Sequence, residues 1–153
     1  MNKGIDIARQ RLTEGGYTCV VLMDDHEYTS YDRGVKPLLF LLQSKRSCTG
    51  AIAADKCVGA GAAHLYVLLG VRAVWANVIS ESAIEVLKNN KIDVYYDQSV
   101  PHIINRKGDG MCPIERAVLG AKTSEEAYDL ILSTLKRLEQ SAKINQISKT
   151  ART

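Results

Sequence analysis

The alternation of strand-like and helical segments between residues 50 and 96 most constrains what this chain can fold into. Short apolar runs that are typical of buried strands alternate there with segments of helical length. The strand-like segments are 50–55, 73–79 and 92–96, and the helical ones are 57–69 and 82–90. Gly70 ends the first helix, and Ser82 with Glu85 has the capping-box spacing that begins the second. Because strand–helix–strand units connect parallel neighbours, this pattern predicts a βαβαβ core in an α/β domain.

Further elements flank this core. Before it, the sequence predicts an amphipathic helix over 3–13, a hairpin of strands over 17–23 and 27–30, and a short helix over 35–45. After it, the sequence predicts an irregular stretch over 97–111, a short helix over 113–119, and a long helix that begins at the capping box of Thr123 and Glu126. Together these elements predict a three-layer α/β/α sandwich with an antiparallel contribution at one edge of its sheet.

The domain organisation follows from where the helical period ends. We expect a single domain over residues 1–141, because a chain of 153 residues has about the length of one domain, roughly 150 residues. After Ala142 the apolar period is lost, so residues 142–153 are predicted to form a frayed C-terminal tail.

Composition and charge exclude several functional classes. Of the 153 residues, 46% are hydrophobic and 24% are charged, as in ordinary globular domains. Twenty Lys and Arg against seventeen Asp and Glu give a net charge of +3, which is too small to indicate a nucleic acid or an anionic membrane as a partner. No apolar run reaches 18 residues, and the first ten residues lack the apolar core of a signal peptide. We therefore expect a cytoplasmic protein that binds neither membranes nor nucleic acid.

The cysteine spacing argues against a structural zinc site. Cys19, Cys48, Cys57 and Cys112 include no CxxC pair, and a zinc ribbon or finger needs such pairs to form its tetrahedron. In a reducing cytosol these residues are expected to be free thiols.

Two segments would meet where the parallel strands end, and they hold the candidate site. In an open parallel sheet the following helices point their N-termini toward that edge, where unpaired N–H groups and the helix dipole favour anions. In the first segment the candidate ligand-binding residues are Asp55, Lys56, Cys57 and Gly59. Residues 59–63 have no side chain larger than a methyl group, so either a ligand or the sheet beneath the helix approaches this backbone closely.

The second segment is 105–115. Its candidate ligand-binding residues are Asn105, Arg106, Asp109 and Cys112, and its candidate catalytic residues are Cys112 and Glu115. Cys112 precedes Pro113 at a predicted helix start, where the dipole would favour a thiolate. A purely structural interpretation stays open, with the Gly108–Gly110 segment as a turn and Glu115 as an acid favoured by the dipole.

Several segments of the chain resemble a known family. They are 16–21, 33–39, 54–59, 65–71 and 100–106, together with the most specific one, Gly108-Asp-Gly-Met-Cys-Pro-Ile-Glu115. They resemble a prokaryotic family catalogued as a domain of unknown function, number 1893, over about residues 3 to 138. That family is grouped with the cytidine deaminase-like proteins, so the resemblance implies a mixed five-stranded sheet between layers of helices.

The same resemblance invites a comparison with zinc deaminases. Those enzymes carry His-x-Glu or Cys-x-Glu at one helix start and Pro-Cys-x-x-Cys at the next, and the Glu shuttles protons. In this chain Asp55-Lys56-Cys57 and Cys112-Pro-Ile-Glu115 fall at those places, without the shuttle Glu. We interpret the chain as a deaminase-like scaffold without the zinc chemistry, and we expect no metal and no cofactor.

The leading hypothesis is a domain that binds a small anionic or nucleotide-like ligand at the converging helix N-termini. Two alternatives stay open: a divergent hydrolase or deaminase that uses a metal or the Cys112 thiolate, and a structural or partner-binding module. The sequence does not decide whether the chain is an enzyme, although the incomplete motifs speak against zinc deaminase activity. It also leaves a homo-oligomer open.

Overall fold

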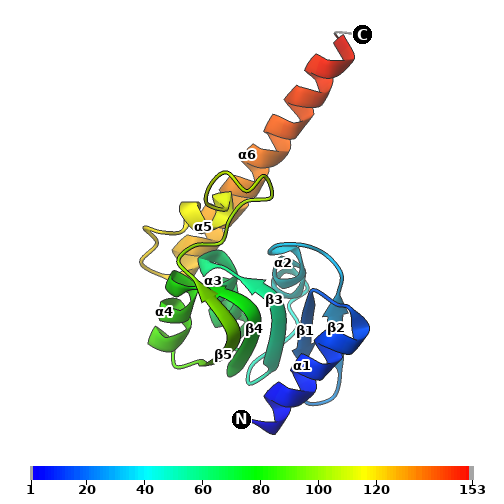
Figure 1. Ribbon diagram of the computed structural model, residues 1–153, viewed down its shortest axis with the longest axis vertical. Helices are drawn as coiled ribbons and strands as arrows, with labels where there is room; N and C mark the ends of the chain where they lie inside the picture. Colours follow the sequence, from blue (N-terminus) through cyan, green and yellow to red (C-terminus); the bar gives the residue numbers. More distant parts are fainter. Residues whose placement is uncertain (1, 152–153) are drawn as a thin grey trace.

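The described part of the chain folds into five strands, which form one sheet, and six helices (Figure 1). The computed structural model describes residues 2–151, with side chains through residue 146. In chain order the elements are α1 (Lys3–Gly15), β1 (Cys19–Leu22), β2 (Glu27–Ser30), α2 (Lys36–Gln43), β3 (Ile52–Val58), α3 (Ala60–Leu69), β4 (Ala73–Ser80), α4 (Glu81–Asn89), β5 (Asp93–Val100), α5 (Pro113–Ala117) and α6 (Ser124–Ala151).

The sheet is mixed and has five strands, in the order β2-β1-β3-β4-β5. β3, β4 and β5 are parallel neighbours, whereas β1 is antiparallel to both β2 and β3. The predicted βαβαβ core and its antiparallel hairpin are therefore confirmed. The sheet also has the mixed five-stranded character that the family resemblance implied.

The two faces of the sheet are covered by different helices, which confirms the three-layer architecture. α1 lies alone on one face, where Ile5, Ala8 and Leu12 pack against side chains that include Ile52 and Trp75. The opposite face carries α2, α3, α4 and the first turns of α6 (Figure 1). Successive residues of a strand point to opposite faces. Ala53 of β3 and its partner Val74 of β4 therefore belong to this second, larger core, whereas Ala54 faces α1.

The boundaries around β3 and α4 differ from the prediction. β3 continues to Val58, because Cys57 and Val58 pair with Val78 and Ile79 of β4. The prediction that Cys57 begins the next helix was therefore wrong, and α3 begins at Ala60. The N-cap of α4 is Ser80, whose side chain accepts a hydrogen bond from the amide of Ala83, so the capping box predicted at Ser82 was also wrong.

The segment after β4 also differs in length. β5 extends to Val100 rather than to residue 96, because Gln98, Ser99 and Val100 continue to pair with the full length of β4. α5 has only five residues, Pro113–Ala117, and Val118 is its C-cap. The irregular segment is consequently shorter than predicted and connects β5 directly to α5.

Helix α6 runs without interruption to Ala151, although a frayed tail was expected from residue 142. No Gly or Pro lies within Ser124–Ala151 to stop the helix, and its hydrogen bonds are local. The apolar period does end, since every described side chain of residues 136–146 is exposed. The distal half of α6 projects away from the body of the domain (Figure 1). Among residues 2–151, no helix is both long and apolar enough to span a membrane.

Gly61 allows α3 to pack closely against α5 and α6. A Cβ atom at Gly61 would lie 2.5 Å from Cγ2 of Ile114 and 3.6 Å from Cδ1 of Ile131. The small residue at position 61 therefore allows close packing against a neighbouring element, which was one of the two explanations expected for the small residues at 59–63. The neighbour is a pair of helices rather than the sheet.

We predict that Gly61→Ala lowers the free energy of unfolding by roughly 1–2 kcal/mol. Forcing the methyl group against Ile114 costs about 1–3 kcal/mol, and the better helix propensity of Ala returns part of that. Urea denaturation measures the difference. Gly120→Ala is the control, because nothing lies within 4 Å of a Cβ placed there. Equal stability of the two variants would contradict the close contact.

Candidate functional site

A cavity of about 350 Å³ lies at the carboxyl end of β3. It opens between the loop that joins β2 to α2 and the segment that joins β5 to α5, with the start of α3 at one side. Its lining residues are Thr18, Cys19, Asp32, Arg33, Gly34, Val35, Pro37, Asp55, Lys56, Cys57, Gly59, Gly61, Ala62, Ile103, Cys112, Ile114 and Glu115. The two segments predicted to meet at this edge of the sheet do meet there.

The predicted site residues divide into two groups. Six of them line the cavity: Asp55, Lys56, Cys57, Gly59, Cys112 and Glu115. Asn105, Arg106 and Asp109 do not line it. They lie in an exposed turn in which the Asn105 side-chain amide donates to Asp109 Oδ1 at 2.8 Å and the Asp109 amide donates to Asn105 Oδ1 at 3.2 Å. These contacts hold the turn together and orient its side chains toward one another.

Glu115 joins three parts of the fold through its carboxylate. The side chain is 1% exposed. Its Oε1 accepts hydrogen bonds from the amide of Ala60 at 3.2 Å and from the hydroxyl of Ser82 at 3.1 Å, and its Oε2 accepts one from the amide of Ile103. The carboxylate thereby connects the first turn of α3, the first turn of α4 and the segment after β5. A buried carboxylate needs such donors to offset its loss of hydration.

The same contact places a negative group at the N-terminus of α3. The amide of Ala60, the first residue of the helix, is bonded to Glu115, and a Cβ at the N-cap Gly59 would lie 3.6 Å from the Glu115 carboxyl carbon. The helix dipole stabilises an anion at this position. The chain itself therefore supplies one anion where the sequence predicted an anion-binding site.

Asp55 is buried at the inner end of the cavity and is bound from two sides. The Tyr66 hydroxyl donates to Asp55 Oδ2 at 2.6 Å, the Cys57 amide donates to Oδ1 at 3.2 Å, and Cys19 Sγ lies 3.6 Å from the Tyr66 oxygen. Burial raises the pKa of Asp55 to about 7, although these hydrogen bonds lower it. Burial likewise raises the pKa values of Tyr66 and Cys19, with the charge of Asp55 adding to both shifts. Near neutral pH the Asp55 carboxyl group therefore exchanges between its protonated and ionised forms.

One side of the cavity, formed by the loop between β2 and α2, was not predicted from the sequence. Asp32, Arg33 and Val35 line the cavity from this loop, and Gly34 turns it with a φ of +66°. A local signal was available, because two charged residues precede a glycine and a helix that starts with Pro37. Nothing in that signal says which distant segment the loop faces.

Comparison with known families identifies the chain. A model of the family described as a domain of unknown function (DUF1893) matches residues 7–135. The chain belongs to the DUF1893 family. A crystal structure of a DUF1893 family protein from Thermotoga maritima is similar to it, with a TM-score of 0.79 and 25% sequence identity, over 87% of this chain and 91% of that one. The family predicted from the sequence motifs is confirmed.

Two deaminases are also among the solved structures that are similar to the present chain. The dCMP deaminase from the cyanophage S-TIM5, in its apo form, has a TM-score of 0.44 and 14% identity, over 65% of this chain and all of that one. The diaminohydroxyphosphoribosylaminopyrimidine deaminase/5-amino-6-(5-phosphoribosylamino)uracil reductase from Thermotoga maritima has a TM-score of 0.40 and 12% identity, over 76% and 40%. No curated protein matches the chain.

The thiols of Cys57 and Cys112, which both line the cavity of the present chain, differ in their surroundings. Cys57 is exposed on the cavity wall, yet neighbouring protein atoms desolvate its thiol and, with the nearby acidic groups Asp55, Cys112 and Glu115, raise its pKa to about 11. Cys112 is the N-cap of α5, but its side chain makes no capping hydrogen bond, and α5 has only five residues. Among the side chains described through residue 146, no three His, Cys, Asp or Glu residues are placed so that they could hold a metal ion.

We predict that Glu115→Gln lowers the free energy of unfolding of the DUF1893 protein by about 1–3 kcal/mol, because the new amide nitrogen faces a backbone donor and leaves it unsatisfied. Urea denaturation measures the loss. Glu125→Gln, at an exposed position in the first turn of α6, is the control and is expected to change stability by less than about 0.5 kcal/mol. A Glu115→Gln variant as stable as this control would mean that the three contacts do not hold the fold.

We predict that the free energy of unfolding of the present chain, measured relative to that of its Asp55→Asn variant, decreases as the pH rises. The pKa of Asp55 is about 7 in the folded chain and about 4 in an unfolded one, so between these values only the folded state holds the proton. The stability difference should therefore decrease from pH 4 to pH 7, by at most about 1.4 kcal/mol per pH unit, and level off above. Urea titrations across this range measure it, with Asp129→Asn, an exposed position on α6, as control. A difference that increases with pH would show that Asp55 is ionised in the fold.

Proposed function

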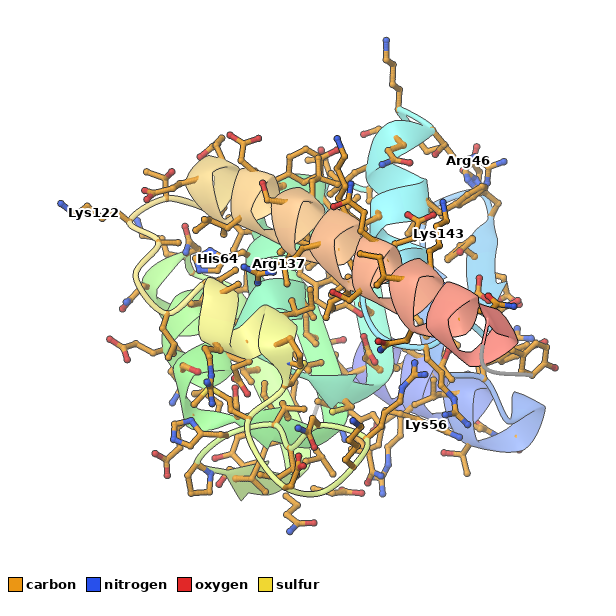
Figure 2. The ribbon with its side chains drawn as sticks, turned by 90° about the horizontal axis from the view of Figure 1, so that it is seen from above. Arg46, Lys56, His64, Lys122, Arg137 and Lys143 are labelled. Carbon is orange, nitrogen blue, oxygen red and sulfur yellow. The ribbon has the colours of Figure 1, made fainter. Side chains whose placement is uncertain are left out.

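We propose that this protein binds a small anionic, nucleotide-like ligand in the cavity at the carboxyl end of β3. The observation that carries the proposal is the pair of cationic side chains on the cavity wall, Arg33 and Lys56, neither of which makes an ion pair within residues 2–146. An unpaired guanidinium and an ammonium group on the wall of one cavity favour a phosphate or carboxylate. In Figure 2, Lys56 is labelled below the distal part of α6 in the plane of the picture, at the opposite side of the view from His64.

The distribution of charge inside the cavity sets the orientation of such a ligand. Three acidic residues line the cavity: Asp32 is exposed, whereas Asp55 and Glu115 are buried, and Glu115 already has three hydrogen-bond donors. An anionic group therefore fits best at Arg33 and Lys56, whose two positive charges outnumber the single charge of Asp32 there, rather than at the two buried carboxyl groups. The inner end favours a part of the ligand that donates hydrogen bonds to Asp55, such as the N–H groups of a heterocyclic ring.

The size and walls of the cavity agree with a ligand of this kind. Its volume of about 350 Å³ lies at the lower end of the range for small-molecule sites, roughly 300–1,000 Å³. Apolar side chains, among them Val35, Ile103 and Ile114, form much of its wall. A flat ring packed against these side chains would be fixed in orientation by the polar groups at either end.

We predict that a nucleotide or a related anionic compound raises the melting temperature of the protein. A ligand present at 100 times its dissociation constant adds about 2.7 kcal/mol, which corresponds to roughly 5–10 °C for a chain of this size. A panel of nucleoside monophosphates, sugar phosphates and carboxylates, measured by thermal shift and then calorimetry, tests this. The binding should weaken at least tenfold in Arg33→Gln and in Lys56→Gln.

Arg106→Gln is the matched control, because Arg106 is only three residues from Ile103, which lines the cavity, but does not line it itself. This variant should bind as the unmodified chain does. If Arg106→Gln weakens binding and the two cavity variants do not, the ligand binds at the exposed turn instead. If no compound of the panel shifts the melting temperature, the proposal fails, and a structural or partner-binding role takes its place.

A further inference from the structure

A second cavity, of about 280 Å³, lies on the other side of the α3 N-terminus. It opens between α4 and the connection from α5 to α6, and α3 forms its inner wall. Its lining includes His64 of α3, Glu85 and Asn89 of α4, and Lys122 of the connection. The two cavities share no lining residue, so any ligand here would occupy a separate site.

His64 is the most deeply buried polar side chain of this second cavity whose hydrogen bonding is incomplete. It is 7% exposed, and its Nδ1 lies 3.0 Å from the Ser124 hydroxyl oxygen. Its other ring nitrogen, Nε2, has no partner within the described part of the chain. Among the described residues no fully buried side-chain nitrogen or oxygen lacks a hydrogen bond, so Nε2 retains access to the space that His64 lines. Burial lowers the pKa of His64, which keeps the ring neutral near pH 7.

The remaining polar groups come mainly from α4. Glu85 and Asn89 are four residues apart and therefore lie on the same face of the helix. Neither side chain makes a hydrogen bond or an ion pair within the described residues. Figure 2 shows His64 on the inner side of the α5–α6 connection, whereas the Lys122 side chain extends outward from the molecule. Lys122 thus lines the cavity, but its ammonium group lies away from the body of the molecule.

An apolar surface completes the second cavity. Val86 and Val118 line it, and Leu119 is 53% exposed beside them. An imidazole, a carboxylate and a carboxamide thus line a space with one apolar side.

We infer that this second cavity binds a neutral polyhydroxylated molecule of about the size of a monosaccharide. A sugar hydroxyl both donates and accepts hydrogen bonds, which matches the acceptors of Glu85, the amide of Asn89 and Nε2 of His64 in either tautomer. The C–H face of the sugar ring would pack against Val86 and Leu119. An anionic ligand is disfavoured, because Glu85 carries a negative charge there and the Lys122 ammonium group points outward.

NMR titration of the imidazole signals tests this inference. Long-range ¹H–¹⁵N spectra report on the His64 ring nitrogens while hexoses, pentoses and inositol are added to 50 mM, with alanine and inorganic phosphate as non-sugar additives. We expect at least one sugar to shift the Nε2 signal of His64 in a saturable way, with no shift at His102, which lies on the exposed β5–α5 segment. Glu85→Gln and Asn89→Leu, both at exposed positions on α4, should each weaken this binding at least fivefold.

Glu81→Gln is the matched control, since Glu81 is on the same helix but does not line the second cavity. It should leave the titration unchanged. The inference is overturned if no sugar shifts the His64 signal, which would mean that water alone occupies the cavity. It is also overturned if the shift is the same in Glu85→Gln and Asn89→Leu as in the unmodified chain. Arg33→Gln, which tests the first cavity, should have no effect here.

Discussion

The buried carboxylate of Glu115 is the interaction on which the arrangement around both cavities depends. Its three donors come from residues that lie 12, 33 and 55 positions away in the chain. Without it, the first amide of α3 and the amide of Ile103 would face the interior without a partner, which costs more than the loss of an exposed hydrogen bond. Because the helix dipole of α3 also stabilises the carboxylate, the cost of burying its charge is offset within the fold.

Glu115 also lies between the two cavities. On one side its carboxylate borders the cavity at the end of β3, and on the other it is bonded to Ala60 and Ser82, which line the second cavity. The close packing of Gly61 against Ile114 sets how far α5 stands from α3, and so contributes to the separation of the two spaces. One acidic side chain and one missing methyl group thus define the geometry of this edge of the sheet.

Local patterns in the sequence predicted most of the architecture, and long-range pairing explains what they did not. The strand over 27–30 and the helix starting at Lys3 agree with the structure, because alternation, glycine stops and capping residues act within a few positions. The length of β3 depends instead on pairing with β4, so Cys57 could not be assigned to a strand from its neighbours alone. In the same way, Cys112 and Glu115 were correctly placed near Asp55, whereas the contribution of Arg33 required knowing which loop faces them. Asn105, Arg106 and Asp109 were grouped with the site because they are close in sequence, but their own turn keeps them outside it.

The two halves of helix α6 should unfold differently, because only its first turns are packed into the core. Its first turns bury Ala127 and Ile131 in the core, but from residue 136 to residue 146 no side chain is covered. That stretch is supported by its own backbone hydrogen bonds and by local pairs such as Lys143 with Glu139 at 3.4 Å, and isolated helices of such length are marginal in water. Its turns can therefore open and reform on a timescale near a microsecond while the sheet stays intact, so its amides should exchange with solvent by local fluctuation rather than by global unfolding. The ellipticity of the protein will then begin to decline on heating before the single tryptophan, buried under α1, reports any change.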